Sequence, residues 1–189
     1  MESNPQVAPG ELERVRDFVN TLDVEDGEET FVDPGALRDW LAVQGLLSAD
    51  EILSEADLRQ AIAVREALRK ALLANNGVPV DSAALDTLNS AAKSAELVVR
   101  FGDEGTGSLA PVRPGLDGAL GRLLAIAHGA MHDGTWSRLK ACPAEDCEWA
   151  FYDSSKNRSR TWCNMAVCGN REKARAFRAR HRRGAPDSR

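Results

Sequence analysis

Apolar residues recur at intervals of three and four positions through most of the first 135 residues, and this spacing predicts amphipathic helices. Asp33 before Pro34, and Ser54 before Asp57, are helix-start signals in which a side chain caps free backbone N–H groups. The predicted helices cover residues 11–22, 34–44, 58–74, 81–95 and 116–131. We expect Leu85 to point inward from the fourth of these helices.

Three segments between the helices have a different pattern. Residues 97–101 contain β-branched side chains and predict a strand, while the Gly- and Pro-rich residues 102–115 predict a loop or the return of a hairpin. Residues 23–29 predict an acidic loop. We therefore expect a mostly α-helical domain over residues 1–135, with one small β-hairpin.

The charge of the chain is divided unevenly between its two parts. The 189 residues include 24 Lys and Arg against 29 Asp and Glu, a net charge of −5. Residues 1–135 contain 11 basic and 23 acidic side chains, a net of −12, whereas residues 136–189 contain 13 and 6, a net of +7. Such asymmetry predicts a basic working module attached to an acidic body.

Hydropathy and cysteine placement indicate the cellular compartment of the protein. No stretch approaches the roughly 20 apolar residues that cross a bilayer, and the polar start lacks the pattern of a signal peptide. We therefore expect a cytoplasmic protein with no membrane association. All four cysteines lie within 27 residues, and a reducing cytoplasm makes disulfides a poor explanation for that cluster.

The four cysteines are the strongest functional signal. Cys142 and Cys147 form one C-x4-C pair, and Cys163 and Cys168 form a second after fifteen residues. Two thiolate pairs separated by a short insert can surround a tetrahedral zinc ion with no open coordination position. We predict one structural Zn²⁺ per chain. The alternative is four free thiols, but free thiols would not explain the paired spacing.

The residues around the cysteines predict a small module over residues 136–184. Its predicted elements are a β-hairpin of residues 148–152 and 158–162, a tight turn at Gly169, a cap at Asn170, a helix over 171–183 ended by Gly184, and then a disordered tail at 185–189. The order of knuckle, β-hairpin and α-helix is typical of a treble-clef-like zinc module.

Basic residues gather on one side of the final helix and on the predicted hairpin. The helix face carries Arg171, Arg175, Arg178 and Arg182, and the hairpin carries Lys156, Arg158 and Arg160. We expect a second helix face, made of Ala174, Phe177 and His181, to face the zinc. Basic side chains release counterions from DNA phosphates, and a helix can enter the major groove, so we predict DNA binding. A solvated helix that neutralises the acidic body is the alternative.

Other candidate residues favour structural roles. We predict that the small core of the module is formed by Trp149, Phe151 and Trp162, and we favour this role over that of platforms for stacked bases. His128 and His132 are four residues apart, but no H-E-x-x-H pattern surrounds them, which favours helix surface or packing over metal binding. No pair of carboxylates has a spacing that selects it for catalysis, so we do not expect an enzyme.

Two parts of the sequence resemble a known family. Cys-Glu-Trp-Ala-Phe-Tyr-Asp-Ser-Ser-Lys-Asn-Arg-Ser-Arg at 147–160 and Trp-Cys-Asn-Met-Ala-Val-Cys-Gly-Asn-Arg-Glu-Lys at 162–173 resemble the CGNR zinc finger. Asp-Phe-Val-Asn-Thr at 17–21, Leu-Arg-Asp-Trp-Leu at 37–41 and Arg-Glu-Ala-Leu at 65–68 resemble the ABATE domain that precedes this finger. Together the two resemblances cover nearly the whole chain.

The resemblance implies a bacterial stress-responsive transcription regulator with a zinc-bound, DNA-binding finger. By position, it makes Arg158, Arg160, Arg171 and Lys173 candidate DNA contacts. Thr161 departs from the family, which often has a second arginine before the Trp-Cys pair, and this weakens one expected phosphate contact.

The resemblance also implies that the helical domain senses a small-molecule effector or mediates association, for example in a homodimer. Asn20 follows the buried-looking pair Phe18-Val19, and its side chain either caps a helix end or lines a ligand pocket. The alternative function is a zinc-stabilised protein-interaction module that does not bind DNA.

Overall fold

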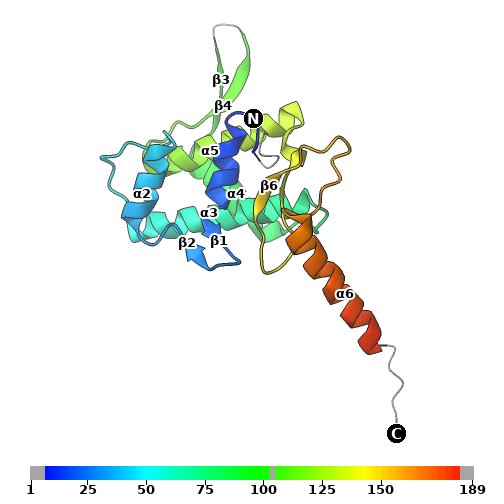
Figure 1. The fold of residues 1–189 in the computed structure, drawn as a ribbon. Coiled ribbons are helices and arrows are strands. Elements are labelled where there is room, and N and C mark those ends of the chain that lie inside the picture. The colour runs from blue at the N-terminus through cyan, green and yellow to red at the C-terminus, as the bar shows by residue number, and fades with distance from the viewer. Residues whose placement is uncertain (1–6, 103–104, 184–189) are drawn as a thin grey trace, which may run out of the picture.

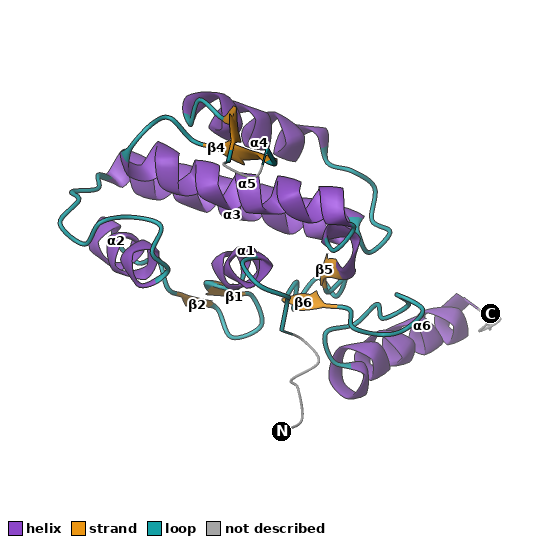
Figure 2. Cartoon of the chain, turned by 90° about the horizontal axis from the view of Figure 1, so that it is seen from above, coloured by secondary structure: helices purple, strands orange, loops and turns teal. Residues whose placement is uncertain are grey.

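The computed structural model describes residues 7–102 and 105–183, and five helices make up its body. These are α1 (Leu12–Val19), α2 (Pro34–Val43), α3 (Glu55–Ala74), α4 (Ser82–Ser94) and α5 (Gly115–Asp133). The long helix α3 runs through the middle, with α1 and α2 on one side and α4 on the other (Figure 2). All four other body helices contact α3.

Helices α2 and α3 start where their capping residues predict. Asp33 accepts a hydrogen bond from the N–H of Ala36, and Ser54 forms a capping box with Asp57. Helix α1 ends at Val19, earlier than expected, because the chain turns there into a short hairpin. The inward position expected for Leu85 is wrong: its side chain is 44% exposed, because α4 packs through neighbouring positions.

One apolar core fills the body. Phe18, Phe31 and Trp40 form an aromatic group with ring centroids 5.6 or 5.7 Å apart. The guanidinium of Arg65 lies over Phe31, 5.6 Å from its centroid, and is paired with Glu29 at 2.6 Å. A buried arginine is therefore part of this core, where its charge is neutralised.

Two short antiparallel hairpins extend from the body. Strands β1 (Leu22–Asp23) and β2 (Glu28–Glu29) pair where an acidic loop was expected. The second hairpin, β3 (Val98–Phe101) with β4 (Gly107–Ala110), confirms the prediction for this segment. It projects away from the helices in Figure 1, and every residue of β3 is exposed.

The cysteine-containing part begins with the 3₁₀ turn η1 (Trp136–Arg138). It continues with strands β5 (Leu139–Ala141) and β6 (Ala150–Tyr152), the π-helical turn η2 (Met165–Gly169) and helix α6 (Asn170–Arg183). The mostly α-helical fold class is confirmed. Residues 158–162 are not a strand, however, because β6 pairs with β5 instead.

The two parts of the chain share one core. Leu139, Ala141 and Ala150 of the β5–β6 hairpin are fully buried and belong to the same apolar cluster as the body helices. Helix α6 leaves this mass and extends away from it (Figure 1). No described helix has the length and apolar character needed to cross a bilayer. Gly184 and the tail at 185–189 lie outside the described residues.

Candidate metal centre and basic helix

Four buried thiols converge in the module. Cys142 and Cys147 lie in the loop between β5 and β6, Cys163 lies in the loop that follows β6, and Cys168 lies in the turn η2. Their sulfur atoms all lie within 4.8 Å of one another. Cys163 lies before η2 and α6 and is not part of either.

The sulfur positions fit a tetrahedral zinc site. The Sγ atoms of Cys147 and Cys163 are 3.4 Å apart, and those of Cys163 and Cys168 are 3.6 Å apart. Four ligands at about 2.3 Å from one metal ion would be separated by about 3.8 Å. None of the four cysteines forms a disulfide. An all-sulfur donor set of this size is suited to Zn²⁺.

Electrostatics also favour a divalent cation at this position. Hydrogen bonds from Cys147 and Cys163 lower the pKa of the Cys142 thiol to about 2. The hydrogen bond to Cys142 raises the pKa of Cys147 to about 12, and Cys163 is raised for the same reason. One thiolate thus forms readily and its charge opposes the others, whereas a bound Zn²⁺ would stabilise all four.

The first cysteine pair lies on a tight knuckle. The thiolate of Cys142 accepts hydrogen bonds from the backbone N–H groups of Ala144 and Cys163, and that of Cys147 accepts one from Trp149. Glu148 takes a left-handed conformation with φ 48°, which turns the chain from Cys147 into β6. Backbone donors to the sulfurs hold metal ligands in place and stabilise their negative charge.

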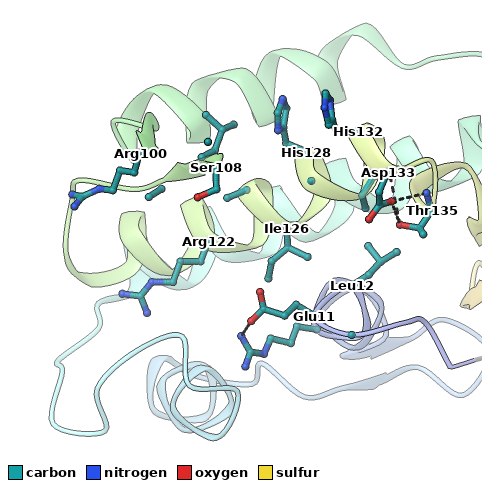
Figure 3. A pocket seen from close by; sticks show the side chains of 18 of the residues that line it. Glu11, Leu12, Arg100, Ser108, Arg122, Ile126, His128, His132, Asp133 and Thr135 are labelled. Atoms are coloured by element: carbon teal, nitrogen blue, oxygen red, sulfur yellow. Dashed lines mark hydrogen bonds and ion pairs between the residues drawn. The ribbon is translucent and has the colours of Figure 1, made fainter. Parts of the chain in front are cut away.

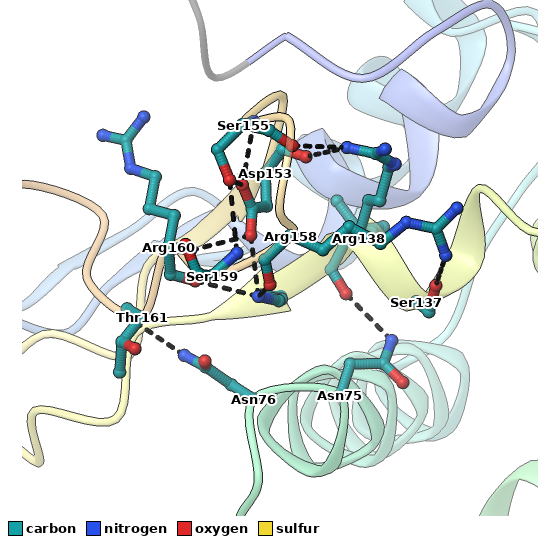
Figure 4. Close-up of polar contacts among 12 residues, drawn as sticks. Asn75, Asn76, Ser137, Arg138, Asp153, Ser155, Arg158, Ser159, Arg160 and Thr161 are labelled. Carbon is teal, nitrogen blue, oxygen red and sulfur yellow. Dashed lines mark hydrogen bonds and ion pairs between the residues drawn. The ribbon is translucent and has the colours of Figure 1, made fainter.

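A buried ion pair replaces the second half of the predicted hairpin. Lys140 of β5 donates to the Asp153 carboxylate at 2.8 Å and to the carbonyls of Arg158 and Arg160 at 2.8 and 2.9 Å (Figure 4). Burial alone would raise the pKa of Asp153, but hydrogen bonds from Lys140 and Ser155 outweigh this effect, so the pKa of Asp153 is below its usual value. The loop at 153–160 is therefore organised around one ammonium group, which satisfies the carbonyls that a partner strand would have bonded.

The turn before α6 differs from the prediction in its capping residue. Asn164, not Asn170, caps this turn, with its side-chain oxygen accepting from the N–H groups of Ala166 and Val167. Gly169 follows Cys168 at a crowded position, where an added Cβ would lie 2.4 Å from Met165 Sδ and 3.0 Å from Trp162 Cδ1. Close packing, and not a positive φ, thus explains the glycine.

Two of the predicted DNA-contacting arginines join parts of the molecule. Arg171 pairs with Glu25 of the body at 2.7 Å and with Asp146 of the knuckle at 3.4 Å, and lies 3.5 Å from the sulfur of Cys168. Arg175 also pairs with Asp146, at 2.7 Å. The first turns of α6 are thereby fixed to the cysteine loops and to the acidic β1–β2 turn.

The other side chains predicted to contact DNA are of two kinds: some bond within the protein, and the rest are exposed. Arg160 donates to the carbonyls of Trp162 and Cys163, and its guanidinium lies over the ring of Phe151. The side chains of Lys156, Arg158, Lys173 and Arg178 are exposed. Arg182 lies in α6, but its side chain is outside the described residues.

The apolar face expected on α6 is wrong in its described part. Ala174 is exposed and Phe177 is 55% exposed, because α6 leaves the body after its first turn. The side chain of His181 is outside the described residues. Phe151 is fully buried with the cysteines, and Trp149 and Trp162 pack partly buried against them, which confirms the predicted core of the module.

Side chains of the body hold the module, and no local pattern in the sequence predicts this role. Asn76, just after α3, donates to the carbonyl of Thr161 (Figure 4) and to the carbonyl of Ala141. Thr161 precedes Cys163 by two residues, and Ala141 precedes Cys142 by one. Asn75 and Arg69 bond other backbone carbonyls of the module. As a sequence, Asn-Asn-Gly at 75–77 indicates only a helix end.

Asn20 has a similar role. Its side-chain N–H₂ donates to the carbonyl of Ala150 at 2.9 Å, and its oxygen accepts from the N–H of Ala150 at 2.8 Å. The amide is thus occupied by strand β6, and Asn20 lines neither of the two grooves described for this structure. His128 and His132 lie on α5, away from the four cysteines, and line one of these grooves.

A closed four-thiolate site on a knuckle and a helix start, supported by a helical body, defines a protein of the zinc-finger class. Residues 138–181 match the family described as "CGNR zinc finger". Residues 13–132 match ABATE, described as "Putative stress-induced transcription regulator", and the chain belongs to this family. The resemblance seen in the sequence is confirmed. None of the curated proteins matches the chain.

Proposed function

We propose that the protein is a transcription regulator whose cysteine module binds DNA through helix α6. The observation that carries this proposal is the helix itself. Residues 170–183 contain seven basic residues and one acidic residue, and α6 projects from the rest of the molecule (Figure 1). A projecting cationic helix can reach the DNA backbone and enter the major groove without a clash from the body.

We infer that one structural Zn²⁺ holds the module in this arrangement. Cys142, Cys147, Cys163 and Cys168 would supply four thiolates, which fill a tetrahedral coordination sphere and leave no position for a substrate. The metal would supply folding free energy and not chemistry, so we propose no enzymatic activity. A DNA-binding role would place the protein in the cytoplasm.

The cations of α6 differ in whether they already have an ion-pair partner, and this difference supports a choice among the proposed DNA contacts. Lys173 and Arg178 are exposed on α6, and no carboxylate of the described residues pairs with them. Arg171 and Arg175 already hold Glu25 and Asp146. We therefore expect the first pair to contribute most to phosphate binding, because no existing ion pair has to break.

Fluorescence anisotropy with a labelled random duplex, measured over a series of salt concentrations, tests the proposal. The variant Lys173→Gln with Arg178→Gln should bind more weakly, and the slope of log affinity against log salt should fall in magnitude by about 2. The variant Arg59→Gln with Lys93→Gln removes the same charge from exposed sites on α3 and α4, and should bind as the wild type does. Affinity that is unchanged by salt and by both variants would contradict DNA binding.

The second candidate function is a protein-interaction module, and one observation favours it. Met165 and Val167 on η2 are 48% and 47% exposed, and Phe177 on α6 is 55% exposed. Exposed apolar side chains near one another in sequence are typical of contact surfaces, including those of homodimers. Self-association in sedimentation experiments that is lost in Val167→Ser with Phe177→Ser, together with absence of DNA binding, would favour this function.

A further inference from the structure

An open groove of about 1070 Å³ lies on the body, and none of the four cysteines lines it. It is bounded by the N-terminal end of α1, the β3–β4 hairpin and α5 (Figure 3). Its apolar lining includes Leu12, Leu109 and Ile126. Sites for small molecules typically combine such an apolar surface with a few polar groups in defined places.

Two cations that pair with no carboxylate of the described residues also line this groove. Within the described residues, the side chain of Arg100 in β3 forms no ion pair or hydrogen bond, and that of Arg122 in α5 donates only to the carbonyl of Leu46. Among the described residues up to 135, only Arg59, Lys93, Arg100 and Arg122 are basic side chains that lack an ion pair with a carboxylate. Half of these unpaired cations therefore lie at one groove.

The acidic groups of the groove are already occupied. Glu11 pairs with Arg14 at 2.8 Å. Asp133 accepts hydrogen bonds from the N–H and hydroxyl of Thr135, which lower its pKa. Among the described residues that line the groove, three arginines (Arg14, Arg100 and Arg122) stand against two carboxylates (Glu11 and Asp133), which leaves a net positive charge on a body whose residues sum to −12.

We propose that this groove binds an amphipathic organic anion. Its carboxylate or equivalent group lies against Arg100 and Arg122, which stand toward one end of the groove in Figure 3, and its apolar part lies along Ile126 and Leu12. Guanidinium groups pair with planar carboxylates through two parallel hydrogen bonds, and an apolar floor stabilises the rest of such a molecule. This inference does not depend on DNA binding.

The groove is also connected to the module. Helix α1 lines it at one end and carries Asn20, which holds strand β6, at the other. Helix α5 lines it and leads through Thr135 into η1 and strand β5. A molecule in the groove therefore contacts the two helices that lead to the β5–β6 hairpin.

Methyl NMR with labelled isoleucine tests the proposal, because the chain has only three isoleucines. Decanoate, an amphipathic carboxylate, serves as the probe. Titration of the zinc-loaded full chain should shift the Ile126 methyl signal saturably and leave Ile52 and Ile62, which do not line the groove, unchanged. The uncharged counterpart decanol should bind about tenfold more weakly, because it cannot pair with the guanidinium groups.

Matched charge variants separate the groove from general electrostatics. The variant Arg100→Gln with Arg122→Gln should weaken decanoate binding about tenfold, whereas Arg59→Gln with Lys93→Gln removes the same charge elsewhere and should leave it unchanged. Unshifted Ile52 and Ile62 signals report that each variant is folded. An Ile126 signal that does not respond, equal binding of decanol, or equal affinity in the Arg100→Gln, Arg122→Gln variant would overturn the proposal.

Discussion

Single polar side chains of the body determine where the cysteine ligands lie. Asn76 holds the carbonyls of Ala141 and Thr161 at 2.9 and 2.6 Å, and so joins the segments that carry the first and third cysteines. Asn20 bonds both polar backbone groups of Ala150. An asparagine side chain is short and has few rotamers, so its hydrogen bonds fix backbone positions more narrowly than those of a long side chain.

We predict that Asn76→Ala weakens zinc retention. The two carbonyls lose their donor, and the segments before Cys142 and Cys163 are no longer held together. Because partners outside the ligand set of a metal site contribute substantially to affinity, we expect zinc to bind about tenfold more weakly, measured by competition with a colorimetric chelator.

Asn89→Ala is the matched control for this experiment. Asn89 is exposed on α4 and its side chain forms no hydrogen bond within the described residues, so its replacement should leave zinc affinity at the wild-type value. Equal zinc affinity in the two variants would show that the body does not position the ligands through Asn76.

At the scale of elements, the helices follow from local signals and the strand pairing does not. Caps and apolar spacing place α2, α3 and α4 within a few residues, because both act over one or two turns. The partner of β6 is β5 and not residues 158–162, because Lys140 satisfies the carbonyls of that loop and β5 brings apolar residues onto α3. A strand pattern in sequence predicts a strand, but not its partner.

Two glycines of α5 should respond in opposite ways to alanine. Helix propensity favours alanine at both positions by about 1 kcal/mol. At Gly129 nothing lies within 4 Å of the added Cβ, so Gly129→Ala should increase the free energy of unfolding by about that amount. At Gly121 the added Cβ would lie 2.6 Å from the Cβ of Ala95 and 2.9 Å from that of Pro111, so Gly121→Ala should decrease it by about 1–3 kcal/mol.

Urea denaturation of both variants, followed by circular dichroism, measures this difference. Gly129→Ala serves as the control for the general effect of alanine on α5. Stabilisation by Gly121→Ala would mean that α5 does not approach Ala95 and Pro111 as closely as the structure indicates.

At the scale of the whole molecule, the acidic body and the basic module are parts of one folded unit. Their apolar residues form a common core, and Glu25 of the body pairs with Arg171 beside Cys168. The charge difference between the two halves of the sequence is thus partly neutralised across a direct contact. Zinc bound to the module would stabilise the body as well, because ordering one side of a shared core supports the other.

We predict that removing zinc destabilises the whole chain in one transition. Chelation under reducing conditions should lower the midpoint of thermal unfolding. The native methyl signals of Ile62 and Ile126 in the body should be lost at the same temperature at which the tryptophan fluorescence of the module changes. Restored zinc should restore the midpoint. A body that unfolds at the same temperature with and without zinc would contradict a shared core.

The sequence by itself determined the helices, the four-cysteine site and the basic character of the last helix, since each depends on residues close together in the chain. Tertiary structure decided which cations are exposed and which strands pair. Arg65 and Arg69 resemble surface residues in a helical pattern, yet both are fully buried, because Glu29, Glu66 and backbone carbonyls from distant segments surround them. Similarly, Arg171 has the sequence character of a phosphate contact and is held by Glu25, 146 residues away. The partner of a charged side chain is set by the fold, so its role cannot be read from local sequence alone.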